Sequence, residues 1–372
     1  MKNSNVLIPI ASPQLGEEEA NAVYYTLKSG WISMGKQVQI FENLCCEYTG
    51  AKFGIAMNNG TSTLHAILMA LDIGSGDEVI LPSLTYISTV NTVLLVGAIP
   101  VLCDNDSKTF NVKPDNIKEK ITGRTKAFIT VDLKGQPVDY DLFCLLSEET
   151  GLSFISDSAE SFGAIYKGKK VGTQALLHSF SFFANKNITT GEGGIVLTDD
   201  IRLANNLRII RNQGQSERYI HTRLGHNYRM TDIQAALGIE QLKRIEHILN
   251  EKVALARHYT EIFSETESIK PPHVPDFVDR PSWYLYSIIL DDKIRDKLID
   301  HLNSLNIETR LSFPPIHIQP YHSKELRCES GDYPNALRSF QTFLDIPIWP
   351  GMRRSTQDIV TREIKSFVEG RV

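Results

Sequence analysis

Cysteine is scarce in this chain of 372 residues, and the few cysteines present do not form pairs. Their positions show neither a CxxC motif nor the spacing of metal ligands. An odd, scattered set of this kind is typical of reduced thiols in a cytoplasm. We therefore expect a cytoplasmic protein that holds no metal. The cysteines are Cys45, Cys46, Cys103, Cys144 and Cys328.

Long apolar runs and concentrations of positive charge are also missing. No stretch approaches the roughly 20 apolar residues of a membrane-spanning helix. Residues 1–10 lack a long apolar core and are interrupted by Pro9, which argues against a signal peptide. The formal net charge is −5, and no basic tract alternates with aromatic residues. We therefore expect neither a membrane nor a nucleic acid as partner, although local basic groups could still bind an anionic substrate.

The composition describes an ordinary globular protein, with 42% hydrophobic and 22% charged residues. The length suffices for a large core and a second, smaller one. Four prolines between residues 271 and 281 indicate a linker close to a change in composition. We predict a large domain over residues 1–264, which includes an N-terminal segment and a long connecting helix, and a small α+β domain over residues 265–372.

Short apolar runs alternate with helical patterns through the first half of the chain. This alternation predicts a largely parallel sheet with helices on both faces, and hence the α/β class. The predicted strands cover residues 53–57, 78–81, 100–103, 127–133 and 153–157. Helices are predicted over residues 16–29, 38–48, 64–71, 113–121 and 139–149, and a long helical region is predicted over residues 233–262. In the small domain we predict strands over 283–290 and 307–310 and helices over 293–302 and 356–368.

Lys186 lies between an apolar, aromatic run over residues 179–184 and a glycine-rich turn over residues 191–194. Glycine allows backbone to approach a ligand closely. A partly buried lysine amine is a candidate nucleophile that forms an imine with a carbonyl. The alternative is a hairpin with one lysine at its rim, and Lys186 by itself would favour that alternative.

Asp157 ends the short apolar strand predicted over residues 153–157. A carboxylate at the C-terminal end of a strand is well placed to meet a ligand in an α/β sheet. An imine-forming lysine and a carboxylate that can hold a pyridinium nitrogen are the minimum apparatus for pyridoxal 5′-phosphate (PLP).

A polar turn with Gly60, Thr61 and Ser62 joins the predicted strand 53–57 to the helix that follows. Free N–H groups and the helix dipole make such a turn a binding site for phosphate. A helix cap without any ligand is the alternative. Together with Lys186 and Asp157, the turn favours a phosphate site.

These motifs resemble a known family. The order strand, aspartate, about thirty residues, then Ser-x-x-x-x-Lys is similar to fold-type I aminotransferases of the aspartate aminotransferase-like fold. Asp157-x-Ala159-Glu160 and the segment 186–194 resemble the DegT/DnrJ/EryC1/StrS family of sugar-nucleotide aminotransferases. Within that family, the resemblance is closest to perosamine synthase-like 4-keto-sugar aminotransferases, and it extends from Gly30 to Pro350.

The resemblance implies a role for each matching residue toward the cofactor. Lys186 would hold PLP and shuttle a proton, and Asp157 would keep the pyridine nitrogen protonated. Asn227 would reach the phosphate bound by the other subunit of a homodimer with shared active sites. The remaining expected cofactor contacts are the phosphate-binding Gly60, Thr61, Ser62 and Ser181, the stacking Tyr86, and Glu160 near the ring oxygen or the sugar.

The resemblance also implies a set of substrate contacts. Trp31 and Ser33 lie in a glycine-bounded loop that is either a substrate loop or a helix connection with the tryptophan in the core. His317 and Tyr321 lie in a segment that the family places near the sugar nucleotide, and Arg229, in the same segment as Asn227, is also expected to bind substrate. Most lone histidines are surface residues or satisfied core residues.

The implied reaction moves an amino group from an amino acid, with L-glutamate as the expected donor, to a nucleotide-linked 4-keto-6-deoxy hexose. A sugar dehydratase of the same fold is an alternative, but that branch has histidine in place of the lysine. A non-catalytic regulator and an α/β domain without cofactor are further alternatives. One departure concerns the substrate. Perosamine synthases tend to have His and Tyr where this chain has Asp132 and Lys134, in a segment expected to touch the substrate, so the exact sugar stays open.

Overall fold

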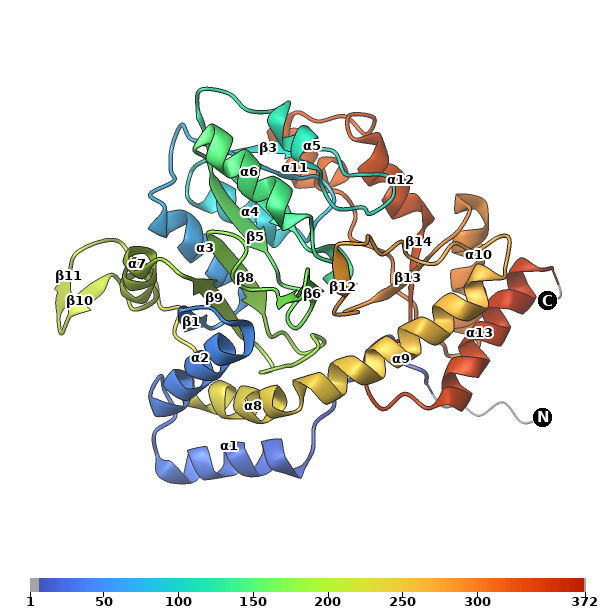
Figure 1. Ribbon diagram of the computed structural model, residues 1–372, viewed down its shortest axis with the longest axis horizontal. Coiled ribbons are helices and arrows are strands. Elements are labelled where there is room, and N and C mark those ends of the chain that lie inside the picture. Colours follow the sequence, from blue (N-terminus) through green and yellow to red (C-terminus); the bar gives the residue numbers. More distant parts are fainter. Residues whose placement is uncertain (1–6, 371–372) are drawn as a thin grey trace.

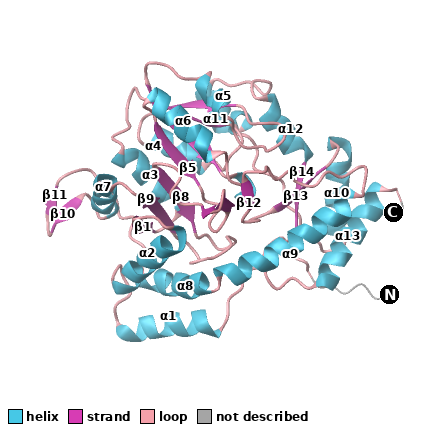
Figure 2. Ribbon diagram, in the orientation of Figure 1, coloured by secondary structure: helices cyan, strands magenta, loops and turns pink. Residues whose placement is uncertain are grey.

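A seven-stranded sheet forms the centre of the computed structural model, which describes residues 7–370 (Figures 1 and 2). The strand order is β1-β9-β8-β5-β4-β2-β3. Only β9 runs against its neighbours, and the other six strands of this sheet share one direction, as predicted for most of it. The strands are β1 (Phe53–Met57), β2 (Glu78–Pro82), β3 (Ile99–Cys103), β4 (Thr125–Val131), β5 (Ser153–Asp157), β8 (Leu177–Ser181) and β9 (Gly194–Thr198).

Apolar side chains cover both faces of this sheet because successive residues of a strand point to opposite sides. Phe128 and Phe154 stack with their ring centroids 5.0 Å apart in one core cluster. Ile129 and Ile155, one residue further along each strand, belong to the cluster on the other face. Burial on both faces requires a layer of helices on each side.

Two layers of helices supply this cover. On the face of Ile129 lie α3 (Gly60–Ala70), α4 (Ser88–Leu95) and α7 (Ile201–Arg211). On the face of Phe128 lie α2 (Lys36–Thr49), α5 (Pro114–Lys118), α6 (Tyr140–Thr150), α8 (Asp232–Lys243) and the start of α9 (Ile245–Ser264). Helix α1 (Glu17–Ser29) packs on α8 and lies outermost in Figure 1.

The long helical region predicted over residues 233–262 is helical but divided in two, because the chain leaves helical geometry at Arg244 between α8 and α9. The Arg244 backbone has φ −106° and ψ 3°. Its guanidinium donates to the Gln14 carbonyl at 2.9 Å and pairs with Glu19 of α1. These contacts fix the interruption of the helix at Arg244 to a segment more than 200 positions earlier in the sequence. The helical periodicity of residues 233–262 therefore could not reveal the interruption.

A separate core lies around β13 (Tyr286–Ile289) and β14 (Phe343–Ile346), which form an antiparallel pair. The second half of α9 packs into it, so α9 links this core to the one at the sheet. The domain boundary at 264/265 stays a prediction. The other helices of this region are α10 (Asp292–Ser304), α11 (Pro320–Leu326), α12 (Pro334–Thr342) and α13 (Arg354–Val368).

The strand predicted over residues 307–310 is wrong. Ile307 and Arg310 make only isolated bridges, to Ile8 and to Asp345. The chain is extended there, but it leaves β14 after a single pair of residues. It then continues into the wall of the central cavity described below.

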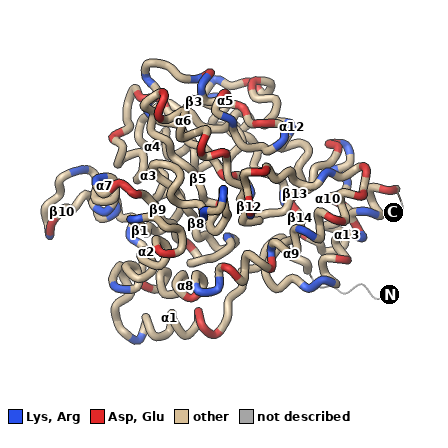
Figure 3. The backbone as a smooth tube through the Cα atoms, in the orientation of Figure 1, with Lys and Arg blue, Asp and Glu red and all other residues tan. Residues whose placement is uncertain are grey.

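Small two- and three-residue strands complete the fold. One group, β6, β7 and β12, forms a small three-stranded sheet, and β10 with β11 forms a projecting hairpin (Figure 1). Acidic and basic residues are interspersed along the chain (Figure 3). In residues 7–370, none of the helices combines the length and apolar character needed to cross a bilayer. The short elements are β6 (Ile165–Tyr166), β7 (Lys169–Lys170), β10 (Gln215–Glu217), β11 (Ile220–His221), β12 (Val278–Arg280) and the 3-10 turns Leu133–Gly135 and Ile316–Ile318.

Candidate active site

One cavity of about 470 Å³ brings eight of the predicted site residues together. It opens where β5 and β8 end and where α3 begins, which is the edge at which α/β sheets bind their ligands. The predicted residues that line it are Gly60, Thr61, Ser62, Tyr86, Asp157, Glu160, Ser181 and Lys186.

Lys186 lies in the turn that connects β8 to β9. Its side chain is 13% exposed, and its Nζ lies 3.5 Å from Oε1 of Glu160. The same Nζ lies 4.0 Å from the centroid of the Tyr284 ring. The amine is therefore held between a carboxylate and an aromatic face while it lines the cavity, in a position to react with a bound carbonyl group.

Asp157 ends β5 with its carboxylate buried at the cavity wall. Thr89 donates to Oδ2 at 2.8 Å, and the Ala159 N–H donates to Oδ1 at 3.3 Å. Burial raises the pKa of Asp157 to about 6, and the two hydrogen bonds and the charge of Lys186 oppose that rise. A desolvated carboxylate with this few partners gains most from a cationic neighbour, such as a protonated ring nitrogen.

The start of α3 forms a cradle for an anion. Asn59 caps the helix by accepting the Ser62 N–H at 2.8 Å. Gly60 has no room for a side chain, because a Cβ there would lie 2.9 Å from Cβ of Ser181. Thr61 is exposed to the cavity and supplies a hydroxyl group. N–H groups, hydroxyl groups and the helix dipole thus converge where a phosphate can bind.

Tyr86 and Glu160 define two further walls. Tyr86 is 54% exposed, and its ring centroid lies 5.3 Å from that of Phe313. Oε2 of Glu160 accepts the Lys134 N–H at 2.6 Å, so this carboxylate is fixed in place. An amine, a buried carboxylate, an anion cradle and an aromatic face in one cavity fit the functional groups of PLP.

Sequence reasoning missed three cavity residues that come from the C-terminal part of the chain, namely Tyr284, Arg310 and Phe313. Arg310 and Tyr284 line the cavity, and the Arg310 guanidinium donates to the Tyr284 hydroxyl at 3.3 Å. The guanidinium also lies 5.0 Å from the Phe313 ring centroid. Among residues 7–370, the ion pairs do not include Arg310. In the sequence, only the proximity of Arg310 to Phe313 pointed to a place in the site. The predicted strand over residues 307–310 gave this arginine a structural position instead.

The predicted substrate residues lie outside the group that lines the cavity. Trp31 is 62% exposed and Tyr321 is 65% exposed, so the alternative of Trp31 in the core is wrong for this chain. Ser33 and Asn227 are also exposed. Arg229 donates to Oδ1 of Asn212 at 2.7 Å. Their roles toward substrate or toward a second subunit stay predictions.

His317 is a core residue here. Its side chain is 1% exposed, with Nδ1 at 2.6 Å from Oγ of Ser83 and Nε2 at 3.2 Å from the Ser330 carbonyl. Both ring nitrogens are thus engaged within the protein. The arrangement favours a structural role, and we drop His317 from the proposed substrate contacts.

The segment with Asp132 and Lys134 also lies apart from the cavity, to which only Val131 of residues 131–135 contributes. Asp132 is buried and accepts hydrogen bonds from Tyr140 at 2.5 Å and from Ser161 at 2.6 Å. Its burial raises its pKa to about 6. Asp132 and Lys134 therefore support the loops around the site, and the expected contact of this segment with substrate stays a prediction.

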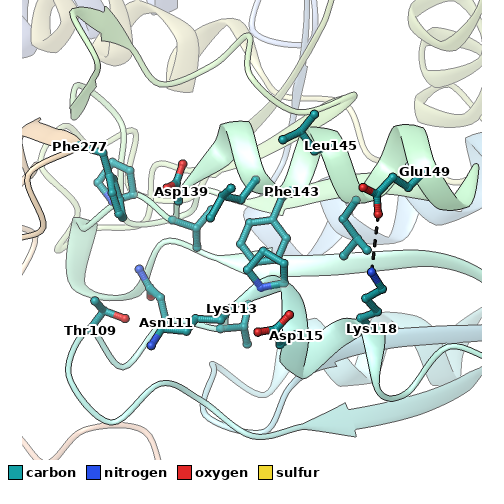
Figure 4. A pocket seen from close by; sticks show the side chains of 16 residues that line it. Thr109, Asn111, Lys113, Asp115, Lys118, Asp139, Phe143, Leu145, Glu149 and Phe277 are labelled. Carbon is teal, nitrogen blue, oxygen red and sulfur yellow. Dashed lines mark ion pairs between the residues drawn. The ribbon is translucent and has the colours of Figure 1, made fainter.

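A second cavity, of about 400 Å³, lies between α5 and α6 (Figure 4). Its walls are mainly apolar side chains such as Phe143 and Leu145, and Lys118 and Glu149 form an ion pair of 3.7 Å at its side. The Lys186 amine, the Asp157 carboxylate and the start of α3 all line the cavity of about 470 Å³ and not this one. The chemistry of the site is therefore assigned to that first cavity.

Comparisons with known proteins identify the family of the chain. The model of the DegT/DnrJ/EryC1/StrS aminotransferase family matches residues 13–365. The chain is 42% identical to GDP-perosamine synthase of Caulobacter vibrioides over 84% of this chain and 86% of that protein. It is 35% identical to the spore coat polysaccharide biosynthesis protein SpsC of Bacillus subtilis, over 100% of this chain and 99% of that protein.

A solved structure shows the same fold with the cofactor. The putative sugar aminotransferase Spr1654 of Streptococcus pneumoniae in its PLP form superposes with a TM-score of 0.93, at 28% identity, over 99% of this chain and 100% of that chain. The same protein is also known in its PMP form. Family, fold and cavity thus agree, and the chain belongs to the DegT/DnrJ/EryC1/StrS aminotransferase family, whose members are PLP-dependent sugar aminotransferases.

Proposed function

We propose that this enzyme transfers an amino group from L-glutamate to a nucleotide-linked 4-keto-6-deoxy hexose, as in the biosynthesis of GDP-perosamine-type sugars for a polysaccharide. The observation that carries the proposal is the cavity in which Lys186, Asp157 and the start of α3 meet. The 42% identity to a GDP-perosamine synthase supports the choice of substrate class.

Different residues of the cavity would bind different parts of PLP. Lys186 would hold the cofactor through its amine, and Asp157 would hold the ring nitrogen. The helix start with Gly60, Thr61 and Ser62, together with Ser181, would hold the phosphate, and Tyr86 would cover a face of the ring. When bound, PLP supplies a ring that accepts the electrons released as the donor loses its Cα proton.

Lys186 has a second task, which is to move protons. Nζ would take the proton from Cα of the amino donor and hold it for the later return of a proton to the substrate. Glu160 lies 3.5 Å from this Nζ and is itself held by the Lys134 N–H. It thereby orients the amine for both transfers.

Arg310 would bind the carboxylate of the amino donor. Its guanidinium lines the cavity with a tyrosine hydroxyl as its hydrogen-bond partner, which leaves donors for a planar anion. A guanidinium fork matches a carboxylate in two parallel hydrogen bonds. This anchor would favour an amino acid over a simple amine as donor.

We further propose a cytoplasmic homodimer with shared sites. The five cysteines are free thiols, which suits a reducing compartment. Asn227 is exposed in the segment that follows the β10–β11 hairpin, so it is accessible to a second subunit. There it would complete the phosphate site of the partner.

A panel of nucleotide-linked keto sugars tests the substrate proposal. Each sugar would be incubated with the PLP-loaded protein and L-glutamate, and the product mass would be measured. We expect the mass of an amino sugar from a 4-keto-6-deoxy hexose, and no product from the Lys186→Ala variant because the imine-forming and proton-moving amine is gone.

Two outcomes would contradict the proposal. Loss of a hydroxyl group without gain of nitrogen would identify the dehydratase reaction instead. Steady turnover by the Lys186→Ala variant would remove Lys186 from its role.

A further inference from the structure

Lys134 adopts a backbone conformation that is unusual for a residue with a side chain. Its φ is 60° and its ψ is 17°, in the left-handed region. Gly135 follows with φ 85°, and a Cβ there would lie 2.8 Å from the Glu160 carbonyl oxygen. The left-handed conformation costs free energy for an L-residue, so the surrounding contacts must hold this turn in place.

The main chain of Lys134 contacts the catalytic side of the cavity. Its N–H donates to Oε2 of Glu160 at 2.6 Å. The other carboxylate oxygen of Glu160 lies 3.5 Å from Nζ of Lys186. The left-handed turn therefore aims a backbone donor at the carboxylate that faces the catalytic lysine.

The side chain of Lys134 reaches in another direction, to β14. Its Nζ forms an ion pair with Oδ1 of Asp345 and lies 4.6 Å from the centroid of the Phe343 ring. The Lys134 side chain is 14% exposed and the Asp345 side chain is 0% exposed. Asp345 also accepts the Ser287 hydroxyl, whereas its Oδ2 has no hydrogen-bond partner. Removal of the lysine would leave this carboxylate buried without its cation.

Asp345 in turn holds the backbone of Arg310. The Arg310 N–H donates to the Asp345 carbonyl at 3.1 Å, and the Asp345 N–H donates to the Arg310 carbonyl at 2.9 Å. This single pair of residues is the point at which the extended segment 307–310 touches β14. The position of the Arg310 guanidinium in the cavity therefore depends on where Asp345 lies.

We propose that Lys134 is a positioning residue that sets two parts of the active-site wall at once, Glu160 through its N–H and Arg310 through the ion pair with Asp345. The inference deepens the proposed function, because it relies on that function for the roles of Glu160 and Arg310. The proposal also gives a role to the lysine at position 134, where perosamine synthases tend to have tyrosine. This lysine joins the loop after β4 to the β13–β14 sheet.

Lys167 offers a matched control elsewhere in the chain. It also has a left-handed backbone, with φ 44°, and its Nζ donates to Asp141 at 2.6 Å. That Nζ lies 5.1 Å from the Tyr166 ring centroid. Lys167 therefore shares the backbone strain, the ion pair and the aromatic contact of Lys134, but it is half-exposed and does not line the cavity.

Hydrogen exchange in the cofactor-free protein tests the coupling independently of catalysis. In Lys134→Met we expect faster amide exchange in peptides that cover residues 157–163 and 307–313, with Lys134→Arg close to wild type and Lys167→Met unchanged there. Lys134→Gly separates the two contacts, since glycine keeps the left-handed backbone and its N–H. In that variant exchange should rise at residues 307–313 and stay low at 157–163.

Kinetics of the PLP-loaded protein give the second measurement. With Arg310 displaced, the KM for L-glutamate of Lys134→Met should rise about tenfold, with a smaller change in the KM for the sugar. Lys134→Arg should restore most of this loss, and Lys167→Met should match wild type.

The outcomes separate this inference from the proposed function. Unchanged exchange at both peptides in Lys134→Met and Lys134→Gly would overturn the positioning role, as would an equal effect of Lys167→Met. A different result is that the Lys134 variants show the expected faster exchange but the wild-type protein aminates no keto sugar. That result would uphold the coupling and reject the proposed function instead. Should Lys134→Met fail to fold, the Lys134→Gly exchange pattern decides.

Discussion

At the scale of single residues, the protein buries charged groups in the active site and in the core beside it, at a cost in free energy. Asp157 is one of them, and its carboxylate lies at the end of β5 with hydrogen bonds from Thr89 and Ala159. Lys252 is another: it is buried on α9, and its Nζ donates to Oδ1 of Asn187 at 2.8 Å and to the Tyr284 carbonyl at 3.1 Å. Neither group has the full set of partners that would repay its desolvation.

Asp157→Asn should stabilise the cofactor-free protein and inactivate the enzyme. Burial raises the pKa of Asp157 to about 6, above its unfolded value of about 3.9, so the stability from this group is present below about pH 4 and is lost as the pH rises through 6. An amide has no charge to desolvate, and the free energy of unfolding at pH 7 should rise by about 2–3 kcal/mol. Most transamination should be lost, because an amide cannot hold a protonated ring nitrogen.

Urea unfolding at pH 7 and pH 5, together with turnover assays, checks both parts. The gain in stability should shrink at the lower pH. Activity within a few-fold of wild type would mean that another group holds the ring nitrogen.

Lys252→Met should change how stability depends on pH. Burial, and to a lesser degree the charge of Lys186, lowers the pKa of Lys252 to about 7, whereas an unfolded lysine has a pKa near 10.4. Between these values the unfolded chain binds more protons, so this group makes wild-type stability rise with pH by up to about 1.4 kcal/mol per unit. The methionine variant should lack this rise.

The measurement is the free energy of unfolding of the cofactor-free protein at pH 7, 8 and 9. Lys243→Met is the control, since Lys243 is an exposed lysine of α8 that pairs with Glu240. Equal slopes in wild type and Lys252→Met would show that Lys252 titrates normally.

At the scale of elements, the start of α3 does more than begin a helix. Asn59 caps it, the Thr63 hydroxyl contacts Oγ of Ser179 at 2.6 Å, and Gly60 lies against Ser181. The helix start is thereby locked to the end of β8. That contact places N–H groups, hydroxyl groups and Ser181 around one point of the cavity, which is the arrangement that an anion requires.

Gly60→Ala should weaken PLP binding while the fold is retained. The new Cβ would lie 2.9 Å from Cβ of Ser181, so either the helix start or the serine must move. Both belong to the proposed phosphate site, and we expect a loss of about tenfold or more in PLP affinity. The same overpacking should lower the stability of the cofactor-free protein by about 1–3 kcal/mol, which leaves it folded.

Absorbance titration with PLP measures this affinity. Gly123→Ala is the control, because a Cβ at that glycine meets nothing within 4 Å. Unaltered PLP affinity in Gly60→Ala would place the phosphate elsewhere.

At the scale of the whole molecule, the site combines distant parts of the chain. Lys186 belongs to the turn after β8, whereas Arg310 and Tyr284 come from the region around β13 and β14. Helix α9 connects that region to the core of the large sheet. The shape of the cavity therefore depends on how these two regions pack against each other.

Mixed dimers test the proposal that two chains share each site. Lys186→Ala and Asn227→Ala chains would be unfolded and refolded together. In a mixed dimer one site lacks both groups, while the other keeps its own Lys186 and receives Asn227 from the partner. Activity should therefore exceed that of either mutant homodimer, because a two-fold interface gives each site one asparagine from the other chain. Activity that never exceeds the mean of the parents, although mixed dimers form, would refute shared sites.

The sequence alone predicted the features that depend on local order. Alternating apolar runs and helical patterns indicated the α/β sheet, and β1 and β5 lie at their predicted bounds. The motifs around Asp157 and Lys186 indicated PLP, because each motif is a short segment whose chemistry requires residues at a set spacing. These features survive folding unchanged, since neighbours in the chain stay neighbours in space.

Only the tertiary structure decided which distant residues meet. Arg310 lies 124 positions after Lys186 in the chain, yet both line one cavity, whereas His317, only seven residues further on, lies in the core. Lys134 faces Glu160 with its N–H and Asp345 with its side chain, and no local pattern encodes that pair of contacts. The reason is physical: periodicity reports which face of an element is buried, but the partner on that face is set by packing between elements far apart in sequence.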